Sequence, residues 1–247
     1  MPPWCWLLPA ASGGPCAVEP LLDVDLRMTS RFKAVLFDHD GTLVASEELH
    51  FAHWQQVLAR HGGALTESLY QRHYAGKPCM DNAEDAIQRF GLSADPAVLA
   101  EQKNETTRAY LETQAFPLMP GAADALARCQ AAGLRMGVVT GARGFMVATT
   151  LRVYQMAPIF ETVVSADDVV QSKPAPDCYL LALQRMGLQA HEAVAFEDTE
   201  HGVAAATSAG LACVAIPTPM SASQDFRAAT VTLPSMRDAV RWALAQP

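Results

Sequence analysis

Short apolar runs alternate with stretches of helical periodicity along most of this 247-residue chain. The apolar runs that predict strands cover residues 33–37, 136–140, 162–165, 193–196, 212–216 and 230–233. A strand that returns parallel to its neighbour needs a crossover, which is usually a helix, so this alternation favours a parallel sheet. The predicted fold is therefore α/β, with a Rossmann-like three-layer core in which helices cover both faces of the sheet.

Predicted helices in this core end where glycine follows the last apolar turn. The patterns over 122–132, 177–186 and 200–209 are followed by Gly133, Gly187 and Gly210. Glycine is the usual residue just past a helix, because it adopts the left-handed conformation without strain. In such a fold, ligands bind at the carboxyl ends of the strands.

One long interval breaks the alternation. Between the first predicted strand and the helix after Gly121, more than 70 residues show no strand pattern. Connections in α/β units normally span about 2–6 residues, so this insert must fold by itself. Its helical patterns cover 47–61, 67–74, 81–90 and 96–113, and Ser46 is a candidate N-cap for the first. We predict a core domain, residues 31–46 and 116–247, with a helical cap domain, residues 47–115, inserted into it.

The N-terminal segment differs from the rest. We predict that residues 1–30 form a poorly ordered leader, and the compact start at Met28 allows a mis-assigned translation start. A secretory signal is the alternative, because residues 4–11 are apolar. However, no basic residue precedes Arg27, whereas a signal peptide begins with a positively charged region.

Charge and composition exclude several classes of protein. The formal net charge is -8, which argues against a nucleic-acid-binding face and against a polybasic membrane anchor. No apolar run reaches the roughly 18 residues that a membrane-spanning helix needs. The six cysteines are scattered without CxxC spacing, which is typical of free thiols in a reducing compartment. We therefore expect a cytoplasmic protein, monomeric or homodimeric, with no nucleic-acid or membrane partner.

Two aspartates follow the first predicted strand directly. Asp38 and Asp40, with Gly41 after them, leave the end of a buried strand together. A simple turn is one alternative, since Asp and Gly favour turns. A calcium loop is another, but the further oxygen ligands that such a loop needs are missing.

Three further polar elements stand near the ends of later strands. Thr140 and Gly141 offer a hydroxyl and backbone N–H groups to a phosphate oxygen, or they simply form a tight turn. Lys173 lies in SKPAPD, where two prolines stiffen its approach; the alternative is a solvated loop lysine. Glu197 and Asp198 follow the strand AVAF, either as ligands or as acidic residues at a helix N-terminus.

The carboxylates among these elements would repel one another at one sheet edge. Like charges about 4 Å apart repel by ~4 kcal/mol at an effective dielectric constant of about 20. A cation is needed to balance Asp38, Asp40, Glu197 and Asp198. Hard oxygen ligands that leave room for water and a phosphate fit Mg²⁺. The metal, Lys173, Thr140 and backbone amides would then all face a transferring phosphoryl group.

Four motifs resemble those of the haloacid dehalogenase-like superfamily, in that family's order over about residues 32–217. They are FDHDGTL, VVTGA, SKPAPDCY and FEDTEHG. The position of the helical insert is similar to that of the subfamily with an α-helical cap after motif one, in its β-phosphoglucomutase and phosphoglycolate phosphatase branch.

The resemblance implies a role for each matching residue. Asp38 would attack phosphorus and become an aspartyl phosphate, and Asp40 would act as general acid and base. Thr140, Gly141 and Lys173 would bind the phosphoryl group. The Mg²⁺ ligands would be Asp38, the carbonyl of Asp40 and Asp198, with Glu197 as a ligand or holding metal-bound water.

The resemblance also concerns the cap. Glu47 and His50 begin its first helix and would reach the active site when the cap closes. Lys103 stands where the mutase has a cap lysine, so the resemblance implies that it binds substrate together with Glu47 and His50. The alternative for Lys103, and for Lys77, is a solvated helix face, which is the simpler interpretation.

Three positions depart from the family pattern. Ala45 replaces a common aspartate in the hinge, and Gly141 replaces a common Asn or Ala. Cys79 falls where the mutase has an arginine for the far phosphate of its sugar bisphosphate. The last departure weakens a mutase assignment.

We therefore predict a Mg²⁺-dependent phosphatase that hydrolyses a small phosphorylated metabolite, either a sugar phosphate or a compound like phosphoglycolate. The alternatives are a hexose phosphomutase and, as a non-enzyme, a catalytically dead regulatory relative. A dehalogenase or phosphonate hydrolase would have no use for the second acid, Asp40.

Overall fold

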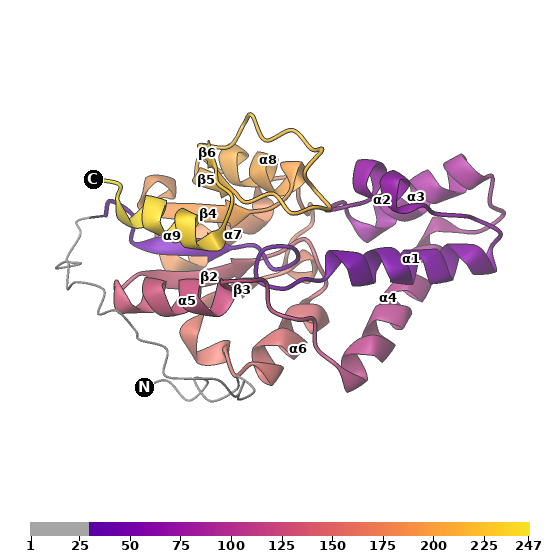
Figure 1. Ribbon diagram of the computed structural model, residues 1–247, viewed down its shortest axis with the longest axis horizontal. Helices are drawn as coiled ribbons and strands as arrows, with labels where there is room; N and C mark the ends of the chain where they lie inside the picture. Colours follow the sequence, from indigo (N-terminus) through magenta and orange to yellow (C-terminus); the bar gives the residue numbers. More distant parts are fainter. Residues whose placement is uncertain (1–29) are drawn as a thin grey trace, which may run out of the picture.

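A parallel six-stranded sheet forms the centre of the molecule (Figure 1). The computed structural model describes residues 30–247, so the predicted leader lies outside the described residues apart from Ser30. The strands run in the order β3-β2-β1-β4-β5-β6, and every pairing is parallel. Their bounds are β1 Ala34–Phe37, β2 Arg135–Val139, β3 Thr162–Val164, β4 Ala193–Glu197, β5 Ala212–Ala215 and β6 Val231–Thr232. This confirms the predicted α/β fold, and each predicted strand ends within one residue of the observed one.

Helices cover both faces of this sheet and complete the three predicted layers. On one face lie α5 (Ala122–Ala131), α6 (Gly144–Val153) and α9 (Met236–Leu244), which form one apolar cluster with Val35 and Phe37. On the other lie α7 (Asp177–Met186) and α8 (Glu200–Ser208), which cluster with Ala34 and Leu36. Successive side chains of β1 therefore pack in opposite layers, because side chains alternate between the two faces of a strand. Short 3₁₀ turns occur at Ala157–Ile159, Ala166–Asp168 and Ala190–Glu192.

Four helices between β1 and α5 form the four-helix segment, residues 47–113, at one end of the sheet (Figure 1). They are α1 (Glu47–Arg60), α2 (Glu67–His73), α3 (Cys79–Phe90) and α4 (Pro96–Thr113). They share an apolar cluster of their own, which includes Trp54, Tyr70 and Leu99. The insert therefore builds its own core, and the exact domain bounds at 46/47 and 115/116 stay a prediction.

The loop after β5 joins the core layers to the four-helix segment. Met220 is buried in the apolar cluster of that segment, and Gln224 Nε2 donates a hydrogen bond to the carbonyl of Ala75 (3.1 Å). Contacts from this loop therefore hold the segment over the strand ends. Among the described residues, no helix combines the length and the apolar character that crossing a bilayer requires.

The predicted side-chain cap of α1 is wrong. Ser46 has helical backbone angles (φ -103°, ψ -19°), and its hydroxyl makes no capping hydrogen bond. An N-cap residue normally has an extended backbone, which turns its oxygen toward the first amides of the helix. The Ser46 hydroxyl instead donates to Asp40 Oδ1 at 2.5 Å, which links the start of α1 to the end of β1.

The packing of Phe37 in β1 predicts how much its truncation destabilises the fold. Phe37 is fully buried and lies edge-on to Phe196 and Phe160, with ring centroids 5.4 and 6.4 Å away. We expect Phe37→Ala to lower the free energy of unfolding by about 3–5 kcal/mol, measured by urea denaturation, because it leaves a cavity in the core. Val170→Ala is the control, since Val170 is 99% exposed. A Phe37→Ala loss no larger than that of the control would contradict this description of the core.

Candidate active site

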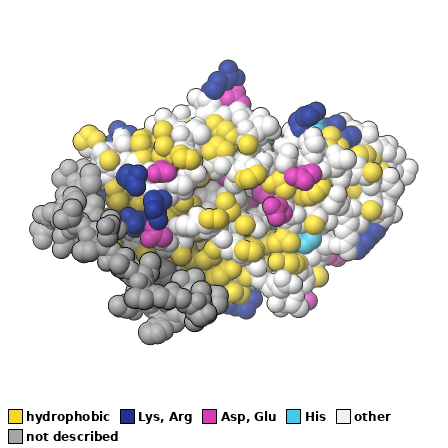
Figure 2. Space-filling model, in the orientation of Figure 1, with side chains coloured by type: hydrophobic (Ala, Val, Ile, Leu, Met, Phe, Trp, Pro, Cys, Tyr) yellow, Lys and Arg dark blue, Asp and Glu magenta, His cyan; other side chains and the backbone are white. Residues whose placement is uncertain are grey.

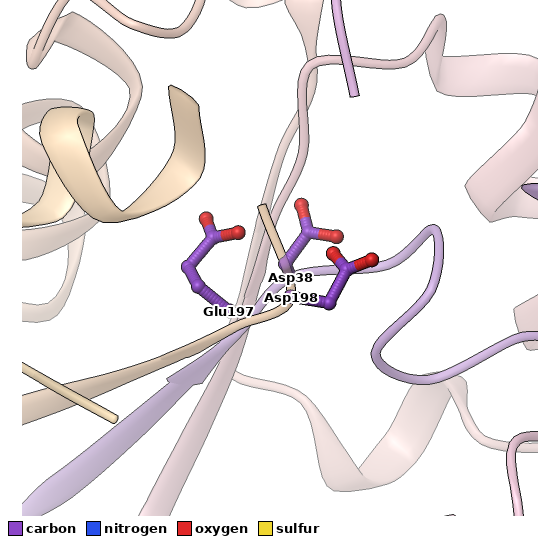
Figure 3. A group of neighbouring side chains, drawn as sticks. All are labelled: Asp38, Glu197 and Asp198. Atoms are coloured by element: carbon purple, nitrogen blue, oxygen red, sulfur yellow. The ribbon is translucent and has the colours of Figure 1, made fainter. Parts of the chain in front are cut away.

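Three carboxylates meet at the ends of two neighbouring strands. Asp38 follows β1, while Glu197 is the last residue of β4 and Asp198 follows it. Phe37 and Phe196 are register partners, and the N–H of Asp38 donates to the Phe196 carbonyl (2.9 Å). One oxygen from each carboxylate lies within 4.8 Å of the others, and the three side chains extend from the strand ends into the same space (Figure 3).

One lysine is bonded to two of these carboxylates. Lys173 Nζ donates to Asp38 Oδ1 (2.5 Å), to Glu197 Oε1 (2.6 Å) and to the Val139 carbonyl (2.9 Å). Burial by itself lowers the pKa of Lys173, but the carboxylates of Asp38 and Glu197 outweigh it and raise that pKa above its ordinary value. The ammonium therefore stays charged, and all three of its hydrogens have acceptors.

The cluster holds more negative than positive groups. Burial raises the pKa of Glu197 to about 7, against the opposing effect of Lys173. Burial, followed by the charge of Asp38, raises the pKa of Asp198 well above its ordinary value. Burial raises the pKa of Asp38 as well, so added positive charge would favour the ionised form of all three carboxylates.

Several oxygens of the cluster have no hydrogen-bond partner. Within residues 30–247, nothing donates to Asp198 Oδ1, Asp198 Oδ2 or Glu197 Oε2, although all three are buried. Buried polar atoms are normally paired, so these oxygens indicate a missing ligand. A set made only of carboxylate oxygens fits a hard divalent cation such as Mg²⁺.

Two glycines make room for these carboxylates. A Cβ atom on Gly41 would lie 2.0 Å from Asp198 Oδ2, and Gly41 has a positive φ of 77° that other residues rarely adopt. A Cβ atom on Gly202, in the first turn of α8, would lie 1.8 Å from Glu197 Oε2. The glycines of motifs one and four are thus required by the carboxylates next to them.

Asp40 lies in a different environment. Its Oδ1 accepts from Ser46 and lies 3.0 Å from His50 Nε2, and its Oδ2 lies 3.1 Å from His39 Nδ1. Burial by itself raises the pKa of Asp40, but the charge and hydrogen bonds of His39 and His50 outweigh it and hold that pKa well below the usual range. The Asp40 carboxylate is therefore separate from the group of three acids.

A cavity of about 300 Å³ separates the strand ends from the four-helix segment. All the predicted site residues except Glu197 line it, namely Asp38, Asp40, Glu47, His50, Lys103, Thr140, Gly141, Lys173 and Asp198. Glu197 lies behind Lys173 and also accepts from the Tyr179 hydroxyl (2.5 Å). The structure thus brings the predicted set together around one space.

Thr140 and Gly141 follow β2 at the wall of this cavity. The Thr140 N–H donates to the Val164 carbonyl, and its buried hydroxyl accepts from the Ala142 N–H at 3.0 Å. The two interpretations of this motif are therefore compatible, because the tight turn itself places Thr140 and Gly141 beside the cavity.

Of the two interpretations of Lys103, the solvated helix face is wrong. Lys103 is only 5% exposed, and its Nζ lies 3.1 Å from His50 Nδ1. A helical pattern does not distinguish a solvated face from one that faces another part of the chain. Lys77 precedes α3, is half-buried and also lines the cavity.

Glu47 is buried beside these residues. Its Oε2 accepts from the Tyr70 hydroxyl at 2.7 Å, and burial raises the pKa of Glu47 to about 7.

Sequence reasoning missed several residues of the site. Tyr179 and His39 lie inside the quoted motifs, but no partner was assigned to either. Ser172 lines the cavity with a buried hydroxyl that has no partner in the described part of the chain. The neighbours of these residues in space come from distant segments, which a single sequence does not reveal.

Comparison with known proteins gives consistent matches. The model of the haloacid dehalogenase-like hydrolase family matches residues 32–210. Protein CbbY of Rhodobacter capsulatus is 34% identical over 227 residues, 87% of this chain and 98% of that protein. The fructose-1-phosphate phosphatase YqaB of Escherichia coli is 34% identical over 189 residues, 76% of this chain and 97% of that protein. The crystal structure of CbbY from Rhodobacter sphaeroides in complex with phosphate has a TM-score of 0.72 at 29% identity, covering 83% of this chain and 95% of that one.

The close approach of Gly202 to Glu197 predicts that alanine at position 202 destabilises the protein. In a helix, Gly→Ala is ordinarily stabilising by roughly 0.5–1 kcal/mol. We expect the opposite for Gly202→Ala, a loss of about 1–3 kcal/mol in urea denaturation, because the new methyl group displaces the Glu197 carboxylate from Lys173 and Tyr179. Gly144→Ala, in the first turn of α6, is the control and is expected to stay within about 0.5 kcal/mol of wild type. A stabilised Gly202→Ala variant would show that Glu197 is not held as described.

Proposed function

Because the chain belongs to the haloacid dehalogenase-like hydrolase family, we propose that it is a Mg²⁺-dependent phosphatase acting through an aspartyl phosphate at Asp38. The reaction class is hydrolysis of phosphoric monoesters, and the substrate is a small phosphorylated metabolite. Relatives that act on sugar phosphates, such as YqaB, support a sugar phosphate. The observation that carries the proposal is the buried acidic cluster around Lys173, with unpaired oxygens beside a cavity.

The carboxylates fit the metal that the family implies. Asp38, the Asp40 carbonyl and Asp198 would hold Mg²⁺, with Glu197 as a further ligand or as support. When bound, Mg²⁺ supplies positive charge against the carboxylates and the phosphoryl oxygens. The unpaired oxygens of Asp198 and Glu197 support this assignment.

Asp38 is the nucleophile in this proposal. Lys173 holds its Oδ1 at 2.5 Å, while no described residue donates to its Oδ2, so Oδ2 is free to attack phosphorus. A bond forms between Oδ2 and phosphorus as the bond from phosphorus to the ester oxygen breaks. Lys173 and Thr140 hold the phosphoryl group, and Gly141 offers its backbone N–H.

Asp40 moves the protons. It donates one to the departing ester oxygen, and it then takes one from the water that attacks the phosphorus of the aspartyl phosphate. That second attack breaks the Asp38–phosphorus bond and releases phosphate. In the free enzyme His39 and His50 favour the ionised form of Asp40, and the negative charge of a bound phosphate raises its pKa toward the range where it carries a proton.

The four-helix segment supplies the remaining contacts to the substrate. Glu47, His50 and Lys103 line the cavity opposite the strand ends, so they are the candidates to contact the leaving group. Cys79 also lines this side and offers no charge to a second phosphate, which favours a phosphatase over a hexose phosphomutase. Every catalytic position is filled, which argues against a dead regulatory relative.

Metal removal tests the proposal directly. In a screen of sugar phosphates, phosphoglycolate and nucleotides, phosphate release should vanish with EDTA and return with Mg²⁺. Ca²⁺ should fail to restore it, because a larger ion with looser ligands misplaces Asp38. Full activity in the chelator would refute the metal assignment.

We expect substitutions of the two aspartates to block different steps of the reaction with p-nitrophenyl phosphate. The good leaving group of this substrate needs little acid assistance. Asp40→Ala should form some phosphoenzyme and then stall, because no base activates the water. Asp38→Asn should form none and should keep less than about a hundredth of the wild-type kcat. Mass spectrometry of quenched enzyme measures the added phosphoryl group. If both variants carry it, or if neither variant nor the wild type ever does, the roles are wrong.

A further inference from the structure

A histidine lies between the two aspartates of motif one and is fully buried. His39 is 0% exposed, and each of its ring nitrogens has one partner. Nδ1 lies 3.1 Å from Asp40 Oδ2, and Nε2 lies 2.9 Å from the hydroxyl oxygen of Thr150. The ring therefore connects Asp40 to helix α6, which covers one face of the sheet.

Both contacts are needed for each ring nitrogen of His39 to have a hydrogen-bond partner. A buried imidazole nitrogen without a partner is costly, so a rotation that breaks either contact is disfavoured. Thr150 is itself fixed, because it is buried and its hydroxyl also lies 3.4 Å from the Met146 carbonyl one turn earlier in α6. His39 is thus held at its far end by the core.

The other side-chain partners of Asp40 belong to a different part of the fold. Ser46 immediately precedes α1 and His50 lies on α1, so these two contacts tie Asp40 to the start of the four-helix segment. Among the described side chains bonded to Asp40, only His39 is anchored in the layers around the sheet. The two Asp40 oxygens thus have different partners: Oδ1 bonds to Ser46 and His50 at the start of α1, and Oδ2 bonds to His39, which is anchored in the core.

We propose that His39 is a positioning residue for the general acid–base Asp40, held in place by Thr150. The inference rests on the proposed function, because it gives a role to Asp40 in proton transfer. An acid or base must lie within about 2.6–3.2 Å of the proton it moves, and a displacement of about 1 Å can cost a hundredfold in rate. The Thr150–His39 link keeps Asp40 aimed at the reacting oxygens when the contacts from α1 change.

Three variants separate the parts of this link. His39→Leu removes both hydrogen bonds at similar volume, His39→Asn keeps an N–H donor near Asp40, and Thr150→Val removes only the far anchor. Thr149→Val is the matched control, because Thr149 is a neighbouring threonine whose hydroxyl, among residues 30–247, bonds only to the Phe145 carbonyl. Thermal denaturation of each variant reports on folding.

We expect His39→Leu to lower kcat about tenfold with KM changed less than about twofold. Thr150→Val should lower kcat about threefold, and the kcat of His39→Asn should lie closer to the wild-type value than that of His39→Leu. With p-nitrophenyl phosphate, His39→Leu should accumulate phosphoenzyme, because the step that needs Asp40 as base becomes slow. A merely structural role would not shift the reaction toward this intermediate. If His39→Leu fails to fold, Thr150→Val and His39→Asn carry the same test.

The decisive comparison uses Asp40→Asn as the background. If His39 acts through Asp40, His39→Leu alone slows hydrolysis of the phosphoenzyme about tenfold, whereas adding His39→Leu to Asp40→Asn leaves the residual hydrolysis rate of that variant unchanged. An equal fold-loss of the hydrolysis rate in both backgrounds, or an unchanged kcat in His39→Leu alone, would overturn the proposal. A wild-type enzyme that releases no phosphate from any monoester would instead overturn the proposed function, and this inference with it.

Discussion

Burial of three carboxylates around one ammonium is the constraint on which the site depends. Asp38 and Glu197 are brought together by the parallel pairing of β1 with β4, and Lys173 spans them from the loop before α7. One lysine does not balance three acids, and the cost of burying unpaired charge is large. This imbalance explains why the Asp198 oxygens have no partner within the described part of the chain and why a cation fits here. The close packing of the same carboxylates requires glycine at positions 41 and 202.

Asp40 is only two residues from Asp38, yet its surroundings push its pKa in the opposite direction. Burial raises the pKa of Asp38, whereas the histidines at 39 and 50 hold the pKa of Asp40 low. Two acids with different environments take different roles, which is a general feature of catalytic pairs. The separation does not come from strand alternation, which places residues i and i+2 on the same face. Because β1 ends at Phe37, Asp40 lies beyond the strand, and its side chain bonds to Ser46 and His50 at the start of α1.

The fold was predictable because its signals are local. Apolar runs located every strand, and Gly133, Gly187 and Gly210 marked three helix ends correctly. Helix α6 was missed because its β-branched residues have weak helix propensity, and burial of Met146 and Val147 in the fold compensates for it. Long-range contacts account for the errors at Ser46 and Lys103. The Ser46 hydroxyl bonds to Asp40 instead of capping α1. Lys103 is buried although the helical pattern alone is compatible with a solvated face.

The central claim is that Asp38 itself becomes bonded to the phosphoryl group. The most direct measurement is a crystal structure of the enzyme grown with Mg²⁺ and beryllium fluoride, which mimics an aspartyl phosphate. Our account predicts beryllium bonded to Asp38 Oδ2, the metal between Asp38 and Asp198, and Lys173 and Thr140 against the fluorides. Beryllium fluoride bonded to another carboxylate, or a metal held away from Asp198, would contradict it.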